Sequence, residues 1–459
     1  WPTIAPPASP HPPTTMRTIR RVFWTFLLLL SAAWWLSDPT PMADLTHVFA
    51  WRAVLLQYTG VLGIGVMALA LVLAARPVAF EPWLGGLDKM YRLHKWLGIS
   101  GLVLSIGHWL LSESAKWMVG LGWLARPERG PRPTLVDEPV RQFFMNQRGL
   151  AEGLGEWAFY AAVALMALAL IKRFPYRYFF RTHHLLAVAY LVLVWHSVVL
   201  LQFDYWSGLL GPVMALLMAA GSIAAVMVLF GRVAVHRQLV GEVAAVRLHP
   251  ALNVIEVDIG FQGRWAGHEA GQFAFVTLHE KEGAHPYTIT SAWADDGRLT
   301  FIIKALGDYT RTLADTVKVG DVVKVEGPYG RFNFAGQQPR QIWVGAGIGI
   351  TPFISRMKAL AKASDGETID LFHTTAVYDE HAIGLIEADA KAAGVCLHVS
   401  WDERDGWLTA ARIAEQVPEW RDADFWFCGP AAFGRTLKKD FVALGLDETR
   451  FHQELFEMR

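Results

Sequence analysis

The sequence predicts a helical membrane bundle followed by an antiparallel β-barrel and a parallel α/β domain, and three observations lead to this fold class. The 459 residues are 53% hydrophobic and only 18% charged, whereas soluble proteins carry about 25% charged residues. The deficit lies in the first half, where apolar stretches follow one another. The second half changes to short β-rich runs and then to alternating strands and helices.

Six stretches of the first half come close to the roughly 20 apolar residues that a membrane-spanning helix needs. The first follows Met16 and lacks a clear small-residue cleavage site, so we expect an uncleaved span rather than a signal peptide. The later spans are predicted at residues 52–75, 93–111, 156–171, 183–201 and 207–230. This gives a disordered N-terminal segment over residues 1–21 and a six-helix membrane domain over residues 22–235.

Lysine and arginine near the span ends predict the orientation. With six spans these residues gather on one side, except for the arginines of the loop 112–155, which we expect to form an external cap. This places both termini and the second half of the chain in the cytoplasm, and we expect the membrane to be a bacterial plasma membrane. Lys plus Arg equal Asp plus Glu at 42 each, so no basic nucleic-acid footprint is present. The two cysteines, Cys396 and Cys428, suit a reducing compartment better than a disulfide framework. The composition therefore indicates membrane lipid, and not nucleic acid, as a binding partner.

Four histidines on the third and fifth predicted spans form two matched levels. His94 and His108 are 14 residues apart, and His183 and His196 are 13 apart. Both separations are near four helical turns, so each pair keeps to one helix face, about 20 Å apart along the axis. An imidazole in lipid is costly without a partner. We therefore predict two stacked haems, an inner one between His94 and His183 and an outer one between His108 and His196.

Two alternatives remain open for these histidines. They could be hydrogen-bonded core or interfacial residues, although four in two matched pairs make this interpretation weak. The doublet also offers His184, which points about 100° away from His183, as a second candidate ligand.

The spacing of the four histidines, the "THH" at the start of the fifth span and the appended second half resemble the NADPH oxidase and ferric reductase superfamily, in a prokaryotic form. The resemblance covers nearly the whole chain after Met16. It implies bis-histidine haems of b type at these four positions, with the first histidine of the doublet, His183, as ligand. It also implies a ferredoxin-reductase-like second half, with an FAD domain over residues 236–337 and an NAD(P)H domain over residues 338–459.

A flavin site is predicted from two motifs in the second half. The first resembles the family's flavin motif and comprises His285, Pro286, Tyr287 and Thr288, followed by Ser291. An isoalloxazine needs an aromatic neighbour such as Tyr287, and the Thr288 hydroxyl can lie near its N5 atom.

The second flavin motif opens a predicted helix with Gly307, Asp308, Tyr309 and Thr310, close to Lys304. Free N–H groups at a helix start suit a diphosphate, although a plain capped helix is equally consistent. By resemblance to such reductases, Phe456 near the C-terminus is a candidate ring against the flavin.

A nicotinamide nucleotide site is predicted at a glycine-rich turn between a strand and a helix. Its residues are Gly345, Ala346, Gly347, Gly349, Thr351 as N-cap and Pro352 at the first helical position. "CGP", residues Cys428, Gly429 and Pro430, resembles the segment that such reductases place near the nicotinamide. NADPH is expected from the resemblance, but Asp379 and Glu380 after the second strand keep NADH possible. Arg404 could supply a charge for a 2′-phosphate.

The resemblance implies a transmembrane enzyme that moves electrons from cytosolic NAD(P)H through FAD and two haems to an external acceptor. O₂ is the first expectation, with Arg52 as an outer cation near the acceptor; a snorkelling role for Arg52 is equally open. Ser112 stands one turn beyond His108, where animal oxidases carry another histidine, so reduction of a ferric chelate remains an alternative. A haem relay to an unknown protein partner is the alternative of another class.

Overall fold

The computed structural model describes residues 16–38, 47–125, 138–171 and 173–454. The chain divides into two compact units. Among the described residues, the helical unit comprises those within 18–77 and 91–233, and the sheet unit comprises 16–17, 78–90 and 234–454. The segment 78–90, which the sequence places between two membrane spans, therefore packs with the sheet unit.

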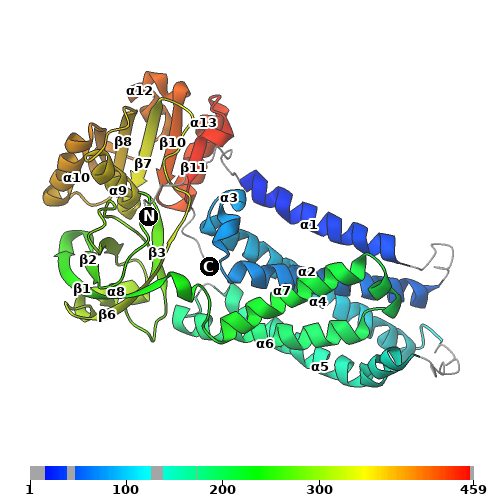
Figure 1. Cartoon of the computed structure of the whole chain (residues 1–459). Coiled ribbons are helices and arrows are strands. Elements are labelled where there is room, and N and C mark those ends of the chain that lie inside the picture. The colour runs from blue at the N-terminus through cyan, green and yellow to red at the C-terminus, as the bar shows by residue number, and fades with distance from the viewer. Residues whose placement is uncertain (1–15, 39–46, 126–137, 172, 455–459) are drawn as a thin grey trace, which may run out of the picture. The chain divides into compact units, whose positions relative to one another are not determined.

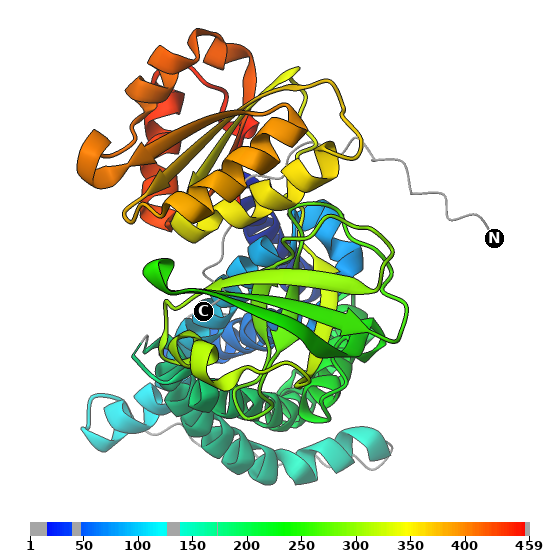
Figure 2. The same cartoon turned by 90° about the vertical axis from the view of Figure 1, so that its left-hand side faces the viewer.

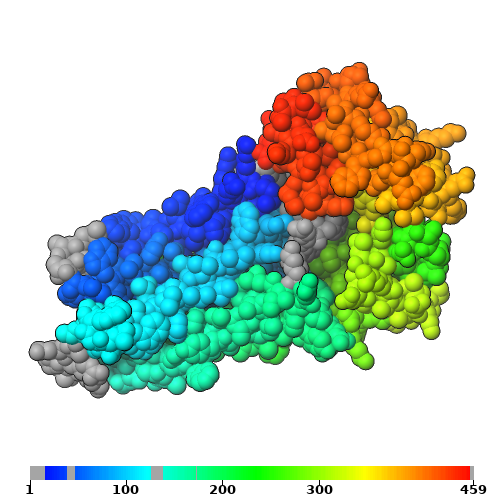
Figure 3. Space-filling view, turned by 180° about the vertical axis from the view of Figure 1, so that it is seen from behind, coloured from blue at the N-terminus to red at the C-terminus, as the bar shows by residue number. Residues whose placement is uncertain are grey.

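The helical unit is built from long helices that run alongside one another (Figure 1). They are α1 Met16–Ser37, α2 Val48–Ala74, α4 Leu87–Gly120, α5 Pro139–Leu170, α6 Tyr176–Leu200 and α7 Leu210–Leu229. The space-filling view shows one face of this unit as bands that run alongside one another, coloured from blue through cyan to blue-green in chain order (Figure 3). Because α1 begins at Met16, residues 16–21 are helical and do not belong to a disordered N-terminal segment.

Five of the long helices, α1, α2, α5, α6 and α7, are long and apolar enough to cross a membrane. The predicted third span, residues 93–111, lies within the 34 residues of α4. That helix has the length of a span, but its two histidines and Lys95 lower its hydropathy. The sixth crossing therefore stays a prediction.

The core of the helical unit lies between α1, α2, α6 and α7. Leu30 and Trp34 of α1 pack there with Leu62 of α2 and Met214 of α7. Tyr190 of α6 is buried in the same cluster, and its hydroxyl lies 3.4 Å from the carbonyl of Met218. Small residues make this close packing possible, because a Cβ atom on Gly221 would lie 2.2 Å from the Tyr190 hydroxyl.

The first sheet of the sheet unit is antiparallel, with strand order β4-β3-β6-β1-β2-β5. Its strands are β1 Gln238–His249, β2 Val254–Phe261, β3 Phe273–Thr277, β4 His285–Thr288, β5 Arg298–Lys304 and β6 Val322–Tyr329. In β2, Ile255, Val257 and Ile259 alternate into the core, as a sheet with one buried face requires. The antiparallel sheet agrees with the sequence prediction, but the predicted closed barrel is not found. Among the described residues, one isolated bridge, Ile289 with Phe301, links the β4 side to β5.

The second sheet is parallel, with strand order β11-β10-β7-β8-β9. Its strands are β7 Arg340–Ala346, β8 Thr368–Thr375, β9 Cys396–Trp401, β10 Ala423–Cys428 and β11 Phe451–Gln453. Helices cover both faces (Figure 2), namely α9 Thr351–Leu360 and α10 Glu380–Ala393 on one face, and α12 Ala410–Gln416 and α13 Ala431–Ala443 on the other. The strand β7 serves both cores, since Trp343 packs on the first face whereas Ile342 and Val344 pack on the second.

Candidate functional site

The four predicted haem ligands lie in the helical unit as two facing pairs. His94 of α4 faces His183 of α6, with ring centres 5.9 Å apart and planes at 66°. His108 of α4 faces His196 of α6, with ring centres 6.4 Å apart and planes at 79°. The structure thus brings together the same partners that the spacing pairs.

These separations fit a shared metal ion. A metal ion bound on opposite sides by two imidazole nitrogens at about 2 Å leaves the ring centres about 6 Å apart. Rings in direct stacking contact would lie closer, and rings bridged by nothing would have no reason to keep this spacing at both levels. Both pairs therefore offer the geometry of two axial ligands.

Protein acceptors fix three of the four rings through Nδ1. His94 Nδ1 lies 2.8 Å from the carbonyl of Ala70, and His196 Nδ1 lies 2.8 Å from the carbonyl of Ala151. A carbonyl oxygen only accepts, so both Nδ1 atoms donate and each Nε2 of a neutral ring keeps its lone pair. This arrangement is typical of metal-binding histidines, whose second nitrogen is held by an outer partner.

His108 reaches the same state through a hydroxyl. Its Nδ1 lies 3.0 Å from Thr59 Oγ1. That hydroxyl donates to the carbonyl of Leu55 at 2.7 Å, so it accepts from His108. The outer ring of α4 therefore also presents Nε2 to its partner.

The doublet of α6 separates into two environments. His183 faces His94 and stacks on Phe179 at 5.0 Å, and its buried Nδ1 has no hydrogen-bond partner among the described residues. His184 instead packs edge-on against Phe180 at 4.3 Å. The structure therefore places His183, not His184, opposite α4.

Sequence reasoning missed a glycine that makes room for one pair. A Cβ atom on Gly155 of α5 would lie 2.0 Å from His196 Nδ1. The ring can occupy this position only because residue 155 lacks a side chain, one turn beyond the acceptor carbonyl of Ala151. Small residues repeated along one helix face are the sequence signal of close helix packing, but this signal does not identify which small residue lies against the histidine ring.

Arg52, the predicted outer cation, is anchored on α4. Its Nε donates to the carbonyl of Leu111 at 2.8 Å, and its Nη2 donates to that of Ser112 at 2.9 Å. Both carbonyls follow His108 within about one helical turn. The guanidinium therefore lies near the level of the His108/His196 pair, and its role toward an acceptor stays a prediction.

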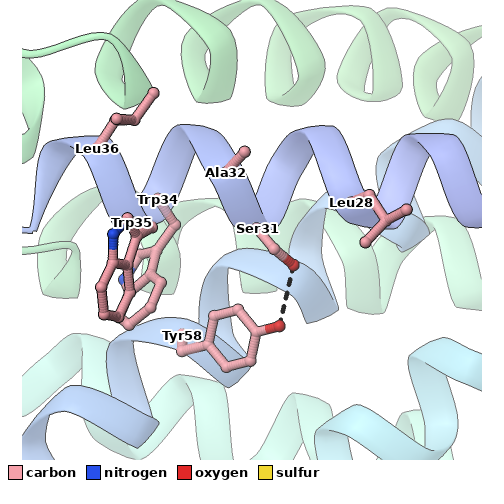
Figure 4. A pocket seen from close by; sticks show the side chains of 7 residues that line it. All are labelled: Leu28, Ser31, Ala32, Trp34, Trp35, Leu36 and Tyr58. Atoms are coloured by element: carbon pink, nitrogen blue, oxygen red, sulfur yellow. Dashed lines mark hydrogen bonds between the residues drawn. The ribbon is translucent and has the colours of Figure 1, made fainter.

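A hollow of about 480 Å³ opens on α1 and α2 of the same unit (Figure 4). Apolar side chains form most of its wall, which consists of Leu28, Ser31, Ala32, Trp34, Trp35, Leu36 and Tyr58. Its two hydroxyls, of Ser31 and Tyr58, bond to each other at 2.9 Å. The hollow suits a hydrocarbon chain, and none of the predicted cofactor residues line it.

In the sheet unit, the two flavin motifs meet although 24 residues separate their rings in the sequence. His285 and Tyr287 lie on β4, and the ring of Tyr309 at the start of α8 stacks on His285 at 4.7 Å. Tyr309 also bonds His279 Nδ1 at 3.0 Å. Burial lowers the pKa of His285 to about 4, so this ring is neutral. The cluster offers the aromatic surface that an isoalloxazine needs.

Two other residues of the predicted flavin site, Thr310 and Ser291, form hydrogen bonds within the fold. Helix α8, Asp308–Thr316, begins after Gly307 as predicted, and Thr310 Oγ1 accepts the N–H groups of Leu306 and Gly307 at 2.9 Å each. Ser291 Oγ accepts from the N–H of Thr300 at 3.1 Å, which ties two parts of the first sheet together. Phe456 lies outside the described residues.

The three glycines of the nucleotide turn have different reasons to be glycine. A Cβ atom on Gly345 would lie 3.1 Å from Ile350 and Phe353, and one on Gly349 would lie 2.1 Å from the carbonyl of Cys428. Gly347 has φ +56° and meets nothing within 4 Å. Close packing therefore explains Gly345 and Gly349, whereas Gly347 opens on the space where a pyrophosphate would approach the helix start.

The predicted N-cap role of Thr351 is wrong. A 3₁₀ turn, η6 Gly347–Ile350, precedes α9, so Ile350 already has helical angles and Thr351 is the first helical residue. Its hydroxyl donates to the carbonyl of Ile348 at 3.2 Å. Pro352 consequently stands one position further into the first turn, where its missing N–H is still tolerated.

The "CGP" segment ends β10 beside this turn. Cys428 pairs in register with Gly345 of β7, and a Cβ atom on Gly429 would lie 2.7 Å from that of Ala346. Pro430 directly precedes α13. Cys428 is buried, and burial raises the pKa of its thiol well above the ordinary value. The structure thus joins two predicted nucleotide segments that lie 80 residues apart.

Sequence reasoning also missed a group of buried carboxyl groups beside this region. Glu81, Asp88 and Glu454 are each about 4% exposed. Burial raises the pKa of Glu81 to about 7. The N–H of Gly330 donates to this carboxyl group at 3.4 Å, which lowers the pKa but only partly offsets the effect of burial. Burial likewise raises the pKa of Glu454, whose Oε2 has no hydrogen-bond partner among the described residues. Acidic residues are expected at solvent-exposed positions, so tertiary contact alone reveals this group.

A carboxylate lies at the end of β8, where a 2′-phosphate would bind. Thr374 donates to Asp402 at 2.7 Å. Arg404, the predicted source of a positive charge, binds Asp405 through two bonds of 2.8 and 2.9 Å. The charge that the sequence suggested for a 2′-phosphate is therefore neutralised by its neighbour.

Comparisons with known proteins match different families to the helical unit and to the sheet unit. Residues 59–194 match a family described as the ferric reductase like transmembrane component, and residues 239–333 match an FAD-binding domain family. A flavohemoprotein of Vibrio cholerae serotype O1 is 30% identical over 148 residues, which cover 31% of this chain and 37% of that protein. An NADPH oxidoreductase of Mycobacterium tuberculosis is 30% identical over 178 residues, which cover 37% of this chain and 47% of that protein.

The chain thus spans less than half the length of either relative. Among solved structures, the flavohem-like FAD/NAD binding domain of nitric oxide dioxygenase from Vibrio cholerae O1 has a TM-score of 0.42 at 23% identity, covering 47% of this chain and 97% of that chain. The two family matches, in this order along one chain, are the decisive finding. The chain therefore has the domain architecture of the NADPH oxidase and ferric reductase superfamily, in which a ferric reductase-like transmembrane region precedes an FAD-binding reductase part.

Proposed function

We propose that this protein is a transmembrane oxidoreductase that passes electrons from NAD(P)H, through FAD and two b-type haems, to an acceptor on the other side of the membrane. The observation that carries the proposal is the pair of imidazole levels on α4 and α6, with ring centres 5.9 and 6.4 Å apart. Two facing histidine pairs in one helical bundle can hold two haems, and two haems can pass an electron from one to the other. A single pair could hold only one haem.

The residues divide the work as follows. His94 and His183 would hold one haem iron, and His108 and His196 would hold the other. The cluster of His285, Tyr287 and Tyr309 would hold the flavin, and the turn at Gly347 beside Cys428 would hold the nucleotide. When bound, FAD converts a two-electron hydride donor into single electrons, which bis-histidine haem iron can carry without an open coordination position.

The protein's own contribution is positioning. Helix carbonyls and Thr59 hold three of the four imidazoles, those of His94, His108 and His196, in one tautomer, so their Nε2 lone pairs are preorganised for a metal. Glycines at the nucleotide turn bring β7 and β10 close together. The proposed arrangement has the membrane domain at residues 22–235, the FAD domain at 236–337 and the NAD(P)H domain at 338–459, with the last two in the cytoplasm of a bacterium.

O₂ is the acceptor that we propose first, with superoxide as the product. Two O₂ molecules would take one electron each for every NAD(P)H oxidised, and one proton would be released on the cytoplasmic side. Arg52, anchored beside the His108/His196 level, would favour the developing anion. Because that guanidinium is already bonded to two carbonyls, reduction of a ferric chelate is the second candidate.

An anaerobic visible spectrum of the purified protein, recorded before and after NADPH or NADH, tests the central proposal. We expect flavin bleaching together with reduction of two low-spin haems. Admission of O₂ should then reoxidise the protein with superoxide formation, whereas the alternative predicts rapid reoxidation by ferric citrate alone. Reduction of haem with no turnover of either acceptor would instead indicate a relay to a protein partner.

The preferred nucleotide is open to a sharper test. The carboxylate near the end of β8 and the Arg404–Asp405 ion pair offer little to a 2′-phosphate. We therefore propose that NADH competes with the NADPH that the resemblance suggests, with kcat/KM values within about tenfold of each other. Arg404→Ala should leave their ratio unchanged.

A further inference from the structure

A second group of potential metal ligands lies in the sheet unit, at the edge strand of the parallel sheet. Asp370 of β8 and Cys396 and His398 of β9 each offer one ligand atom, and these atoms all lie within 4.8 Å of one another. No other group of three such residues meets this limit in the described part of the chain. None of the three belongs to the flavin, nucleotide or haem sites.

Strand geometry explains why these residues meet. Cys396 and His398 are two residues apart, so their side chains leave β9 on the same face. Asp370 lies directly opposite Cys396 in the parallel register, and Phe372 lies opposite His398. The three ligands therefore occupy one face at neighbouring positions of two strands.

The distances between the ligand atoms are close to those of a tetrahedral ion site, which small side-chain movements would complete. His398 Nε2 lies 3.5 Å from Cys396 Sγ and 3.1 Å from Asp370 Oδ1. Bonds of about 2.0–2.3 Å to a tetrahedral ion place its ligand atoms roughly 3.3–3.8 Å apart. A single imidazole nitrogen thus faces both other ligands, whereas a Cys-His-Asp catalytic triad would use the two ring nitrogens for its two neighbours.

The surroundings hold each ligand in place. The ring of His398 lies flat on Phe372, with centres 4.5 Å apart and planes at 12°. The other carboxylate oxygen of Asp370 binds Arg340 at 2.6 Å, which leaves Oδ1 directed toward the histidine. Such outer contacts orient the ligands of established metal sites. Arg340 also places a positive charge nearby, so a bound ion needs a strongly bonding thiolate to remain.

We propose that Asp370, Cys396 and His398 form a binding site for a borderline-soft divalent cation of the Zn²⁺ class. Sulfur, nitrogen and oxygen donors in one tetrahedral set select Zn²⁺ or Cd²⁺ over Mg²⁺ or Ca²⁺. Cys396 is exposed and the His398 side chain is 25% exposed, so water or a small anion completes the fourth position. The site exchanges its ion with solvent and lies near the amino ends of β8 and β9, whereas nucleotide binds at the carboxyl ends of the strands.

The cysteine content makes the test simple. The chain has two cysteines, and Cys428 is buried, so an alkylating agent acts on Cys396 in the native protein. The experiment measures N-ethylmaleimide labelling of Cys396 by peptide mass spectrometry in the full chain with its cofactors and without a histidine tag. We expect micromolar Zn²⁺ to slow labelling by about 10-fold or more, and Mg²⁺ to have no effect.

Two variants distinguish the site from a lone thiol. His398→Phe keeps a ring on Phe372 but removes both nitrogens, and it should reduce the protection by Zn²⁺ to less than about twofold. His381→Ala, which removes an exposed histidine of the same unit, should retain full protection. Protection that persists in His398→Phe, or equal labelling with and without Zn²⁺ in the parent protein, would overturn the proposal.

A structural measurement covers the case in which His398→Phe fails to fold. Zinc-edge X-ray absorption of the Zn²⁺-loaded parent protein is not obscured by iron. One sulfur neighbour at about 2.3 Å with nitrogen and oxygen neighbours at about 2.0 Å is expected. A shell without sulfur would show that the ion binds elsewhere, and the proposal would fail.

Discussion

The two units build their candidate sites from different parts of the chain. In the helical unit the candidate site consists of side chains, four imidazoles of which three are held by carbonyls and a hydroxyl of neighbouring helices. In the sheet unit the nucleotide turn consists of backbone, and the decisive residue, Gly347, has no side chain at all. A metal needs donor atoms at fixed distances, whereas a phosphate needs N–H groups and room. Substitutions should therefore act through lost donors in one unit and through lost space in the other.

Loss of a donor should have the largest effect. His183→Ala removes one axial ligand, so the content of low-spin haem should fall from two per chain to one, measured by haem assay and low-temperature electron paramagnetic resonance. His184→Ala is the matched control, because that ring packs on Phe180 and faces no histidine of α4. Two unchanged low-spin centres in His183→Ala would show that His183 is not the ligand.

Gly155→Ala tests whether space also matters in the helical unit. The added methyl group would lie 2.0 Å from His196 Nδ1, so the ring or the helix must move, at a cost of about 1–3 kcal/mol. We expect weaker haem binding at the His108/His196 level only, seen as loss of one Soret component during purification. Gly153→Ala, where nothing lies within 4 Å, should keep both haems. Equal haem content in the two variants would contradict the packing role of Gly155.

Gly347→Ala makes the corresponding test in the sheet unit. A side chain there fills the open space at the nucleotide turn and also destabilises the positive φ by about 1 kcal/mol. We expect KM for NAD(P)H to rise roughly tenfold while flavin content is kept. Gly366→Ala has a similar φ of +77° and open surroundings, so it should show the stability loss without the change in KM. An identical KM in the two variants would remove Gly347 from the site.

Glu81→Gln should have the smallest effect, visible only through pH. The folded state raises the pKa of Glu81 from 4.5 to about 7, so it binds the proton more tightly than the unfolded chain does. Stability from this group is present below about pH 4.5 and is lost as the pH rises to about 7, by at most about 3 kcal/mol. The glutamine variant should therefore gain thermal midpoint over the parent at pH 8 but not at pH 5. Glu387→Gln, at an exposed position, should change neither; a pH-independent difference in Glu81→Gln would refute the linkage.

The two units differ in how much of their sites could be predicted from the sequence. Helical periodicity alone places His94, His108, His183 and His196 in register, because side chains repeat on a regular cylinder. It does not reveal the carbonyls of Ala70 and Ala151, since every residue has a carbonyl. In the sheet unit the structure brings the motif residues together, with Tyr309 against His285 and Cys428 beside Gly345, and their binding roles stay a prediction. Thr351 proved to be the first helical residue rather than the cap.

The sequence by itself determined the order of the parts: apolar helices with matched histidines, then an antiparallel sheet, then a parallel α/β sheet with a glycine-rich turn. Composition and periodicity are local properties, so they can be read without contacts. Only the tertiary structure decided that segment 78–90 packs with the sheet unit, that Gly155 makes room for His196, and that Asp370, Cys396 and His398 converge. Each of these depends on which distant segments pack together, and packing is a property of the whole fold.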